Sequence, residues 1–204
     1  MKIIPREISR KQAHDVLAST IIPRPIAFVG TMSRDGVYNC APFSFFAPVS
    51  SEPMVLGFST VWNRDGVKKD TLANIESTKE FTINVVDDAI LHAMNKASGN
   101  YPPEVDEFEE AGLTPVTSDM VSAPRIGESK VCFECRLNGT MEFSSPKYTT
   151  TFIAGEVLLV HIDEEALTID DCTVCGLRAI ARLGADNYCG LGDVFELKRP
   201  DEVW

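Results

Sequence analysis

The sequence lacks any apolar run that approaches the roughly 20 residues needed to cross a bilayer. Residues 1–15 carry charges where a secretory signal would have its apolar centre. Basic residues are also scarce, because 19 Lys and Arg stand against 30 Asp and Glu and give a net charge of −11. We therefore expect a cytoplasmic protein that binds neither nucleic acid nor membranes, and that needs a local basic cluster to hold any anionic ligand.

The usual signatures of nucleotide-binding and hydrolytic sites are missing as well. The sequence contains neither GxGxxG nor GxxxxGK[ST], so Rossmann and P-loop sites have no support. Its three histidines, His14, His92 and His161, fall in different predicted elements, and no GxSxG accompanies them. We expect no metal site and no catalytic side chains, which leaves chemistry carried by a bound cofactor.

Four of the six cysteines form two pairs, and the members of each pair are three residues apart. Cys132 and Cys135 lie in an alternating, strand-like segment, so they should point to opposite faces and serve packing. Cys172 and Cys175 fit a turn or short helix, where a zinc half-site or a redox pair could form. No second CxxC or histidine pair completes a site, so a structural role is the favoured interpretation for these thiols too.

Short alternating or β-rich segments dominate the chain. They span residues 25–33, 36–46, 53–60, 80–87, 130–143 and 148–163. Many strands at short spacing favour a mainly β protein, an antiparallel barrel or sandwich, over alternating βαβ units. The pair Asp35-Gly36 between two apolar runs predicts a hairpin turn.

Helical patterns are few. Residues 69–80 predict a helix with Asp70 as its N-cap, and residues 87–98 predict another that stops at Gly99. Residues 100–130 read as an ordered excursion with one short helix at 105–111, because apolar positions keep recurring there. We therefore expect one domain over residues 1–204.

The segment YNCAPFSFF, residues 38–46, interrupts an apolar strand with polar residues and a proline. Pro42 cannot donate to a β-ladder, so it marks a sheet edge, a bulge or a strand end. Asn39 and Ser44 place polar side chains beside main-chain groups that are then free. This combination suits a flat heteroaromatic ligand with a polar edge. A plain edge strand with a bulge is the alternative.

A second segment, NRDGVKKDTLANI, places two lysines before a predicted helix start. Lys68, Lys69, Thr71 and the first helix amides could hold a phosphate. A capping Asp70 would occupy part of that anion site, which makes Lys69 and Thr71 better candidates than the bare helix terminus. A solvated helix start is the alternative interpretation.

Several segments together resemble the flavin reductase-like, FMN-binding split-barrel proteins, close to the flavoredoxin branch. The resemblance rests on RPIAFVGTMSRDGVYNCAPFSFFAPVSSEPMVLGFS and KKDTLANIESTKEFTINVV, followed in family order by GLTP, APRI and ARLGADNYC. It runs from about residue 20 to residue 200. The resemblance implies a six-stranded split β-barrel of the Greek-key type with flanking helices, which works as a homodimer with FMN near the subunit boundary.

The resemblance also implies which positions would contact the flavin. Positions that match the flavin-lining segments are Thr31, Met32, Ser33, Asn39, Cys40, Ala41, Pro42, Ser44 and Ser59. Positions that match the motif at the phosphate end are Lys69, Asp70, Thr71 and Asn74. Arg24 and Arg182 are further candidates, the latter reaching toward the site of a partner subunit.

The function implied by the resemblance is transfer of reducing equivalents from NAD(P)H through bound FMN to flavin or another acceptor. Main-chain amides beside the flavin would stabilise its negative charge after reduction. One alternative is a flavoredoxin-type FMN electron carrier that takes electrons from a redox protein, and a redox protein or monooxygenase is a candidate partner. Another is a split barrel that binds no flavin, against which Asn39, Ser44, Lys69 and Thr71 argue.

Overall fold

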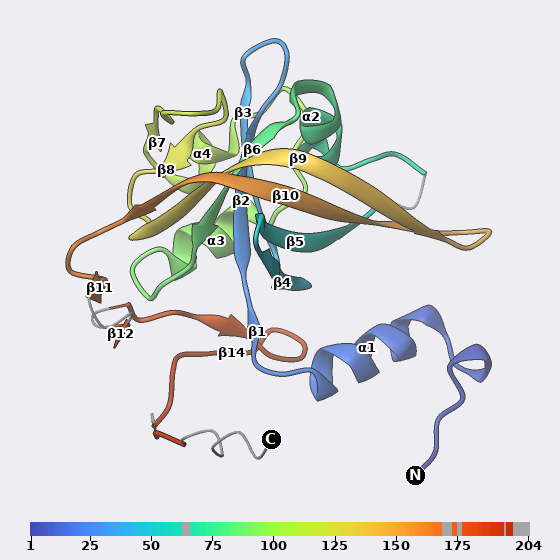
Figure 1. Cartoon of the computed structure of the whole chain (residues 1–204). Helices are drawn as coiled ribbons and strands as arrows, with labels where there is room; N and C mark the ends of the chain where they lie inside the picture. Colours follow the sequence, from blue (N-terminus) through green and yellow to red (C-terminus); the bar gives the residue numbers. More distant parts are fainter. Residues whose placement is uncertain (63–65, 169–172, 175–176, 194, 198–204) are drawn as a thin grey trace.

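The computed structural model of the chain describes residues 1–62, 66–168, 173–174, 177–193 and 195–197. Cys172 and the neighbouring Cys175 lie outside the described residues. Within the described part, seven strands form an antiparallel sheet in the order β3-β2-β6-β9-β10-β5-β4 (Figure 1). No helix of this part is both long and apolar enough to cross a membrane.

Each of the six predicted β-rich segments contributes strand residues to this sheet. Its strands are β2 (Ala27–Met32), β3 (Tyr38–Phe43), β4 (Phe46–Ser51), β5 (Met54–Val61), β6 (Glu80–Val85), β9 (Val131–Ser144) and β10 (Thr149–Ile162). The predicted hairpin turn also forms, since Gly36 adopts a φ of 84° between β2 and β3. The prediction of one strand over 36–46 was wrong, because β3 ends at Phe43 and a separate strand β4 follows.

The bend between β3 and β4 closes the barrel. β3 and β4 are consecutive in the chain but stand at opposite ends of the sheet order, so the sheet must curl until its two edges meet. At that meeting point the amide of Ser59 on β5 donates to the carbonyl of Phe45 in the bend, at 2.9 Å. Pro42 of β3 lies opposite Phe28 of β2, and β3 is an edge strand of the sheet and therefore a position where a proline is tolerated. Of the three alternatives predicted for Pro42, a sheet edge, a bulge or a strand end, the structure shows the sheet edge.

The curled sheet buries apolar side chains on both of its faces. Val29 on β2 and Cys135 on β9 belong to the cluster inside the barrel, whereas the neighbouring Phe28 and Cys40 belong to a second cluster outside it. Because β2 is covered on both faces, its burial is nearly continuous instead of alternating. Cys132 is also buried, but it stands outside the inner cluster, as expected for a thiol three positions from Cys135.

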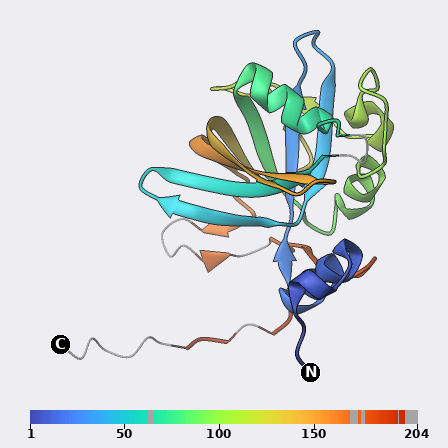
Figure 2. The ribbon, with the colours of Figure 1, turned by 90° about the vertical axis from the view of Figure 1, so that its right-hand side faces the viewer.

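The helices found among the described residues flank the barrel: α1 (Arg10–Thr20), α2 (Asp70–Thr78), α3 (Leu91–Ala97) and α4 (Glu107–Ala111), with a 3₁₀ turn at Pro5–Glu7. α2 and α1 lie at opposite ends of the barrel, while α3 and α4 pack beside the sheet (Figures 1 and 2). α3 starts four residues later than predicted, because Asp87 instead pairs with Ala179 in a β-bridge and accepts the amide of Ala89.

Helix α1 was missed at the sequence level. Ser9 and Gln12 form a reciprocal capping box at its start, a pattern that is readable in the sequence. The other end is held by Arg24 on β1 (Arg24–Pro25), which donates to the carbonyls of Ala18 and Ile21 at 2.6 and 3.0 Å. The same guanidinium donates to the carbonyl of Leu183 at 2.9 Å, which ties α1 to the C-terminal segment.

Short strand pairs complete the fold. β1 pairs with β13 (Ala181–Arg182), which pairs with β14 (Tyr188–Cys189); β7 (Pro115–Val116) pairs with β8 (Arg125–Ile126), and β11 (Leu167–Thr168) pairs with β12 (Thr173–Val174). The excursion over residues 100–130 contains α4, β7 and β8. Thr82 on β6 donates to the carbonyl of Pro124 at 2.8 Å, which fastens this excursion to the sheet.

Candidate functional site

A cavity of about 830 Å³ lies where β3, the start of α2 and the chain after α3 meet. Its lining includes Asn39, Ala41 and Pro42 of β3, residues 67–71, and residues 97–101. Trp62, Tyr101 and Tyr148 add aromatic walls, and Arg10 of α1 adds a cation. We call this space the main cavity. Its volume and its mixture of apolar walls with a few polar groups suit a cofactor-sized ligand.

The start of α2 presents uncapped amides to the main cavity. The prediction that Asp70 is the N-cap was wrong, since α2 begins at Asp70 and Lys69 occupies the cap position. Lysine has no side-chain acceptor, and no side-chain cap bond forms there. The amides that follow Asp70 in the first turn are therefore left for another acceptor, while the amide of Asp70 interacts with its own carboxyl group. Burial raises the pKa of Asp70, with a further rise from Glu104, while its own amide and Lys69 oppose that rise.

The two lysines of the KKDT motif differ in their surroundings. The ammonium of Lys68 lies 2.6 Å from a carboxylate oxygen of Glu76 and sits over the ring of Trp62, 5.1 Å from its centroid. The side chain of Lys69 makes no hydrogen bond or salt bridge with any residue that the structure describes, although its carbonyl accepts the amide of Ala73 at 3.1 Å. Lys69 is thus the cation of this motif whose charge is left for a ligand.

A buried hydrogen-bond network forms the polar wall of the site. The Oδ1 atom of Asn39 accepts bonds from the hydroxyls of Thr31 and Thr71, both at 3.0 Å. The amide of Asn74 donates to the Thr31 hydroxyl at 3.1 Å. All four residues are at least nine-tenths buried. Their side chains therefore bind one another and fix the shape of the wall, since a satisfied buried network is rigid.

Glu107 of α4 completes this network, and the sequence reasoning missed it. The Nδ2 atom of Asn39 donates to Oε1 of Glu107 at 2.7 Å. Burial raises the pKa of the Glu107 carboxyl to about 7, and the charges of Asp70 and Asp106 add to that rise, while its own backbone amide and Asn39 oppose it. The acidic run DEFEEA, residues 106–111, is typical of a helix start, but it does not indicate which of its carboxylates is buried.

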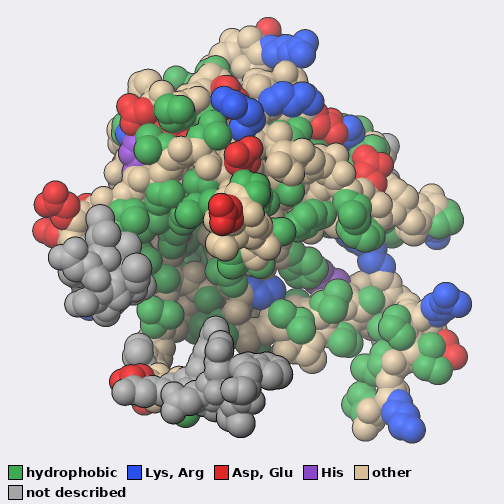
Figure 3. Space-filling model, viewed as in Figure 1, with side chains coloured by type: hydrophobic (Ala, Val, Ile, Leu, Met, Phe, Trp, Pro, Cys, Tyr) green, Lys and Arg blue, Asp and Glu red, His purple; other side chains and the backbone are tan. Residues whose placement is uncertain are grey.

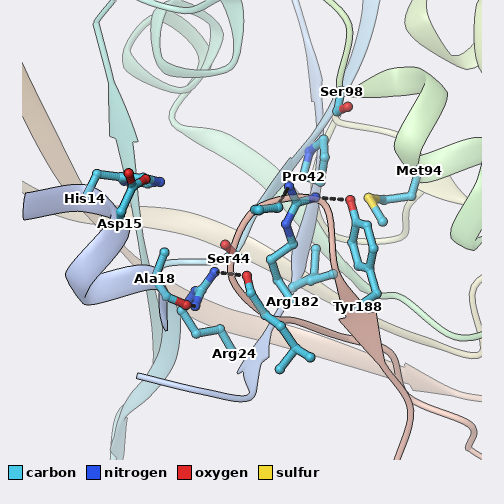
Figure 4. A pocket seen from close by; sticks show the side chains of 13 residues that line it. His14, Asp15, Ala18, Arg24, Pro42, Ser44, Met94, Ser98, Arg182 and Tyr188 are labelled. Atoms are coloured by element: carbon cyan, nitrogen blue, oxygen red, sulfur yellow. Dashed lines mark hydrogen bonds between the residues drawn. The ribbon is translucent and has the colours of Figure 1, made fainter. Parts of the chain in front are cut away.

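A second cavity of about 310 Å³ lies next to the main one, between α1 and the C-terminal segment (Figure 4). Pro42 and Ser98 line both cavities, so β3 runs past the two in succession. Arg24, Ser44 and Arg182 line the second cavity. Among the predicted residues, Pro42 lines both cavities, whereas Ser44 in the barrel bend lines the second cavity and not the main one.

Both arginines of the second cavity donate hydrogen bonds to other groups of the chain. The Nη atoms of Arg24 donate to three carbonyls, and burial followed by the nearby charge of Arg182 lowers its pKa. Arg182 donates to the hydroxyl of Tyr188 and to the carbonyl of Ala185, and its guanidinium covers the Tyr188 ring (Figure 4). Arg24 therefore chiefly holds the end of α1 in place, while Arg182 forms part of the cavity wall.

The remaining predicted positions fall outside the main cavity. The side chain of Cys40 points into the outer apolar cluster, and burial raises its thiol pKa, as do Glu107 and Asp106. Ser33 accepts the amide of Val37 in the β2–β3 turn and lines a smaller cavity of about 420 Å³. Met32 at the end of β2 and Ser59 on β5 line none of these three cavities.

One group of potential metal ligands occurs in the described part of the chain, away from these cavities. Oxygen or nitrogen atoms of Asp119, Glu134 and His161 lie within 4.8 Å of one another. Glu134 accepts the amides of Asp119 and Met120 and lies 2.6 Å from Nε2 of His161. Burial opposes ionisation of Glu134, but these bonds hold its pKa below the usual range. The carboxylate is thus occupied in fastening the excursion to β9.

The curled antiparallel sheet with a large cavity at its seam defines a split-barrel protein. The family model for the flavin reductase like domain matches residues 18–175. The chain therefore belongs to the flavin reductase-like family, as the sequence motifs indicated.

Solved structures agree with this assignment. The nitrilotriacetate monooxygenase component B from Bacillus cereus superposes with a TM-score of 0.92 at 32% identity, over 97% of this chain and 98% of that one. A protein with a split barrel domain from Shewanella frigidimarina reaches 0.82 at 23% identity, over 96% of each chain. The flavoredoxin of Desulfovibrio vulgaris reaches 0.75 at 24% identity, over 86% and 91%. The last two show the fold alone, and the predicted split-barrel fold is confirmed.

The residues of the main cavity fit the flavin that this family implies. The unpaired Lys69 and the uncapped amides of α2 suit a phosphate group. Apolar and aromatic walls from Pro42, Trp62 and Tyr148 suit the faces of a ring system. The edge strand β3 supplies main-chain groups on the side that faces no other strand of the described sheet.

Proposed function

We propose that this protein binds FMN in the main cavity and passes reducing equivalents from NAD(P)H through the flavin to free flavin or another acceptor. The observation that carries the proposal is the convergence of β3, with its buried Asn39 network, and the uncapped start of α2 with Lys69 on one cofactor-sized cavity. Membership in the flavin reductase-like family supports it.

In this proposal, the two ends of the cavity have different tasks. Lys69 and the first amides of α2 hold the phosphate, where a cation and a helix terminus act together on an anion. Residues 39–44 of β3 face the polar edge of the ring, with Ser44 at the far end toward the second cavity. Arg24 and Arg182 define that end of the binding surface.

Bound FMN would supply the acceptance of a hydride and the release of electrons singly or in pairs. The chain's own residues then bind, orient and exclude water. The Asn39 network keeps β3 in one position, so the main-chain donors along it need no rearrangement when negative charge develops on the ring. The aromatic side chains of Trp62 and Tyr148 line one part of the cavity and would exclude water from a ring bound there.

The test is a visible absorption spectrum of the purified protein incubated with FMN, followed by anaerobic mixing with NADH or NADPH. We expect a bound-flavin spectrum with quenched flavin fluorescence, and bleaching within the dead time or the first seconds after NAD(P)H addition. A protein that stays colourless and leaves flavin fluorescence unchanged would refute the proposal.

A second candidate is a flavoredoxin-type electron carrier with the same FMN site but no direct reaction with nicotinamide. The fold similarity to the Desulfovibrio vulgaris flavoredoxin favours keeping it. The same mixing experiment separates the two, because a carrier holds its flavin oxidised in NAD(P)H until a reduced redox protein is added. The similarity to a monooxygenase component B makes an oxygenase a further candidate acceptor.

We also propose that the protein works as a homodimer with the flavin near the subunit boundary. Hydrophobic side chains gather on the surface of the molecule over the sheet (Figure 3). Val49, Met54, Met141 and Phe143 are each between 45% and 59% exposed, which is a large apolar area for a monomer to leave in water. Light scattering after size exclusion should give twice the 22.4 kDa chain mass.

A further inference from the structure

Glu107 lies where the main cavity and the smaller cavity share a wall. Its side chain lines both spaces, yet the residue is only 6% exposed. Oε1 accepts the bond from Asn39 at 2.7 Å, whereas Oε2 is buried and has no hydrogen-bond partner among the described residues. A buried, unpartnered carboxylate oxygen is costly when charged, so this group has a reason to bind a proton or to face a ligand donor.

The charges around Glu107 do not neutralise it. No lysine or arginine of the described chain forms a salt bridge with it. Asp70 of α2 and Asp106 of α4 face it, and Cys40 of β3 lies close enough for the carboxylate to raise the pKa of that thiol. On the side of α3, Lys96 lies 3.9 Å from a different carboxylate, that of Glu110. Other charged residues that line the two cavities are Arg10, Lys68, Lys69, Asp35 and Glu104.

We propose that Glu107 is a positioning residue of the candidate flavin site, which orients Asn39 and makes the affinity for the flavin phosphate depend on pH. This inference rests on the proposed function. Neutral Glu107 adds no charge to the wall, whereas ionised Glu107 adds a second carboxylate beside Asp70. An anionic ligand is therefore held more tightly when Glu107 carries its proton.

The linkage between proton and ligand runs in both directions. With a carboxyl pKa of about 7 in the empty site, Glu107 is largely ionised at pH 8 and largely neutral at pH 6. Binding an anion nearby raises that pKa further, so flavin binding near pH 7 takes up protons from the buffer. The excursion over residues 100–130, which carries α4, thereby belongs to the ligand site.

The test is a titration of the full chain with FMN between pH 6 and 8.5, in which quenching of the flavin fluorescence measures binding. We expect the ratio of the wild-type Kd to the Glu107→Gln Kd to rise about three- to tenfold from pH 6 to pH 8.5. A change of this size is expected when one negative charge is added within the same cavity as the phosphate. The ratio of the two constants is the readout, since ionisation of the FMN phosphate affects both proteins equally. Glu109→Gln, an exposed change on the same helix, should follow the wild type.

Calorimetry of the wild type in two buffers of different ionisation enthalpy gives an answer that requires no variant. Proton uptake at pH 7 supports the inference, and the absence of uptake with a constant Kd ratio overturns it. If the chain binds no FMN at any pH, the proposed function fails and the flavin part of this inference fails with it. Infrared titration of the flavin-free protein then still decides whether a carboxyl band with a midpoint near pH 7 is present and is lost in Glu107→Gln.

Discussion

At the scale of single residues, Asn39 is the point on which the polar wall of the site converges. It accepts from Thr31 on its own hairpin and from Thr71 on α2, and it donates to Glu107 on α4. Three elements that are far apart in the sequence are thus held by one amide. Because the donors and acceptors match, the amide can take only one orientation, and this fixes the position of β3 beside the main cavity.

The hydroxyl of Thr71 can be removed without a change of shape. We expect Thr71→Val to lower the free energy of unfolding by about 1 kcal/mol, because one buried hydrogen bond is lost and Asn39 keeps only one of two donors. We also expect weaker FMN binding, since β3 and α2 are no longer joined. Denaturant unfolding and flavin titration measure the two effects. Thr20→Val, the same change at an exposed helix position, should alter neither of them.

The charge of Lys69 should matter for FMN and not for riboflavin. We expect Lys69→Gln to weaken FMN binding about tenfold, as the loss of one charge-assisted contact to a phosphate would. Riboflavin lacks the phosphate, so its affinity should stay the same. Lys11→Gln, with the same change in net charge on an exposed lysine, is the control. Equal losses for both flavins would place the phosphate elsewhere.

At the scale of elements, the position of α1 depends on one buried side chain. Arg24 donates to carbonyls at the end of α1 and to that of Leu183, and in the described part of the chain it forms no salt bridge. The resemblance named the arginine in the PRP motif as a further candidate for the flavin site. The structure shows that its hydrogen-bond donors hold the wall of the second cavity together.

We expect Arg24→Gln to loosen α1 and the segment around Leu183. Several carbonyl groups lose their donors, and each buried unsatisfied group costs about 1 to 3 kcal/mol. Hydrogen exchange of residues 10–20 should speed up strongly while the amides of β9 and β10 stay protected. Lys11→Gln breaks only an exposed ion pair on α1 and should leave exchange unchanged. Slow exchange of α1 in Arg24→Gln would show that other contacts hold it.

The sequence predicted the elements whose patterns are local. The six strand segments and the turn at Gly36 follow from alternation and turn chemistry, and they are present. Strand β4 was missed because nearly all of its residues are exposed, so its sequence shows no alternation of apolar and polar residues. Asp70 was placed at the wrong helix position by one residue, since helix ends are the least defined part of a propensity pattern. Glu107 was missed because only the folded chain brings it to Asn39.

At the scale of the whole molecule, the buried Glu107 should make stability depend on pH. Its folded pKa of about 7 lies above the ordinary value of 4.5. The folded state therefore binds more protons between these values, so the contribution of Glu107 is fully present below pH 4.5 and is lost as pH rises through 7. We expect the melting temperature of Glu107→Gln minus that of the wild type to increase as the pH rises from 5 to 8. A constant difference in melting temperature across that range would contradict this.

The bend at residues 44–45 joins β3 and β4, the two strands at the opposite ends of the sheet order. Most open sheets leave these two edges independent, but here a covalent link only a few atoms long connects them. Widening the barrel must therefore pull on Ser44 and Phe45, and through them on β3. Because β3 also lines the main cavity, a change in the spacing of the two sheet edges would change the shape of the cavity, and a ligand that fills the cavity would oppose widening of the barrel.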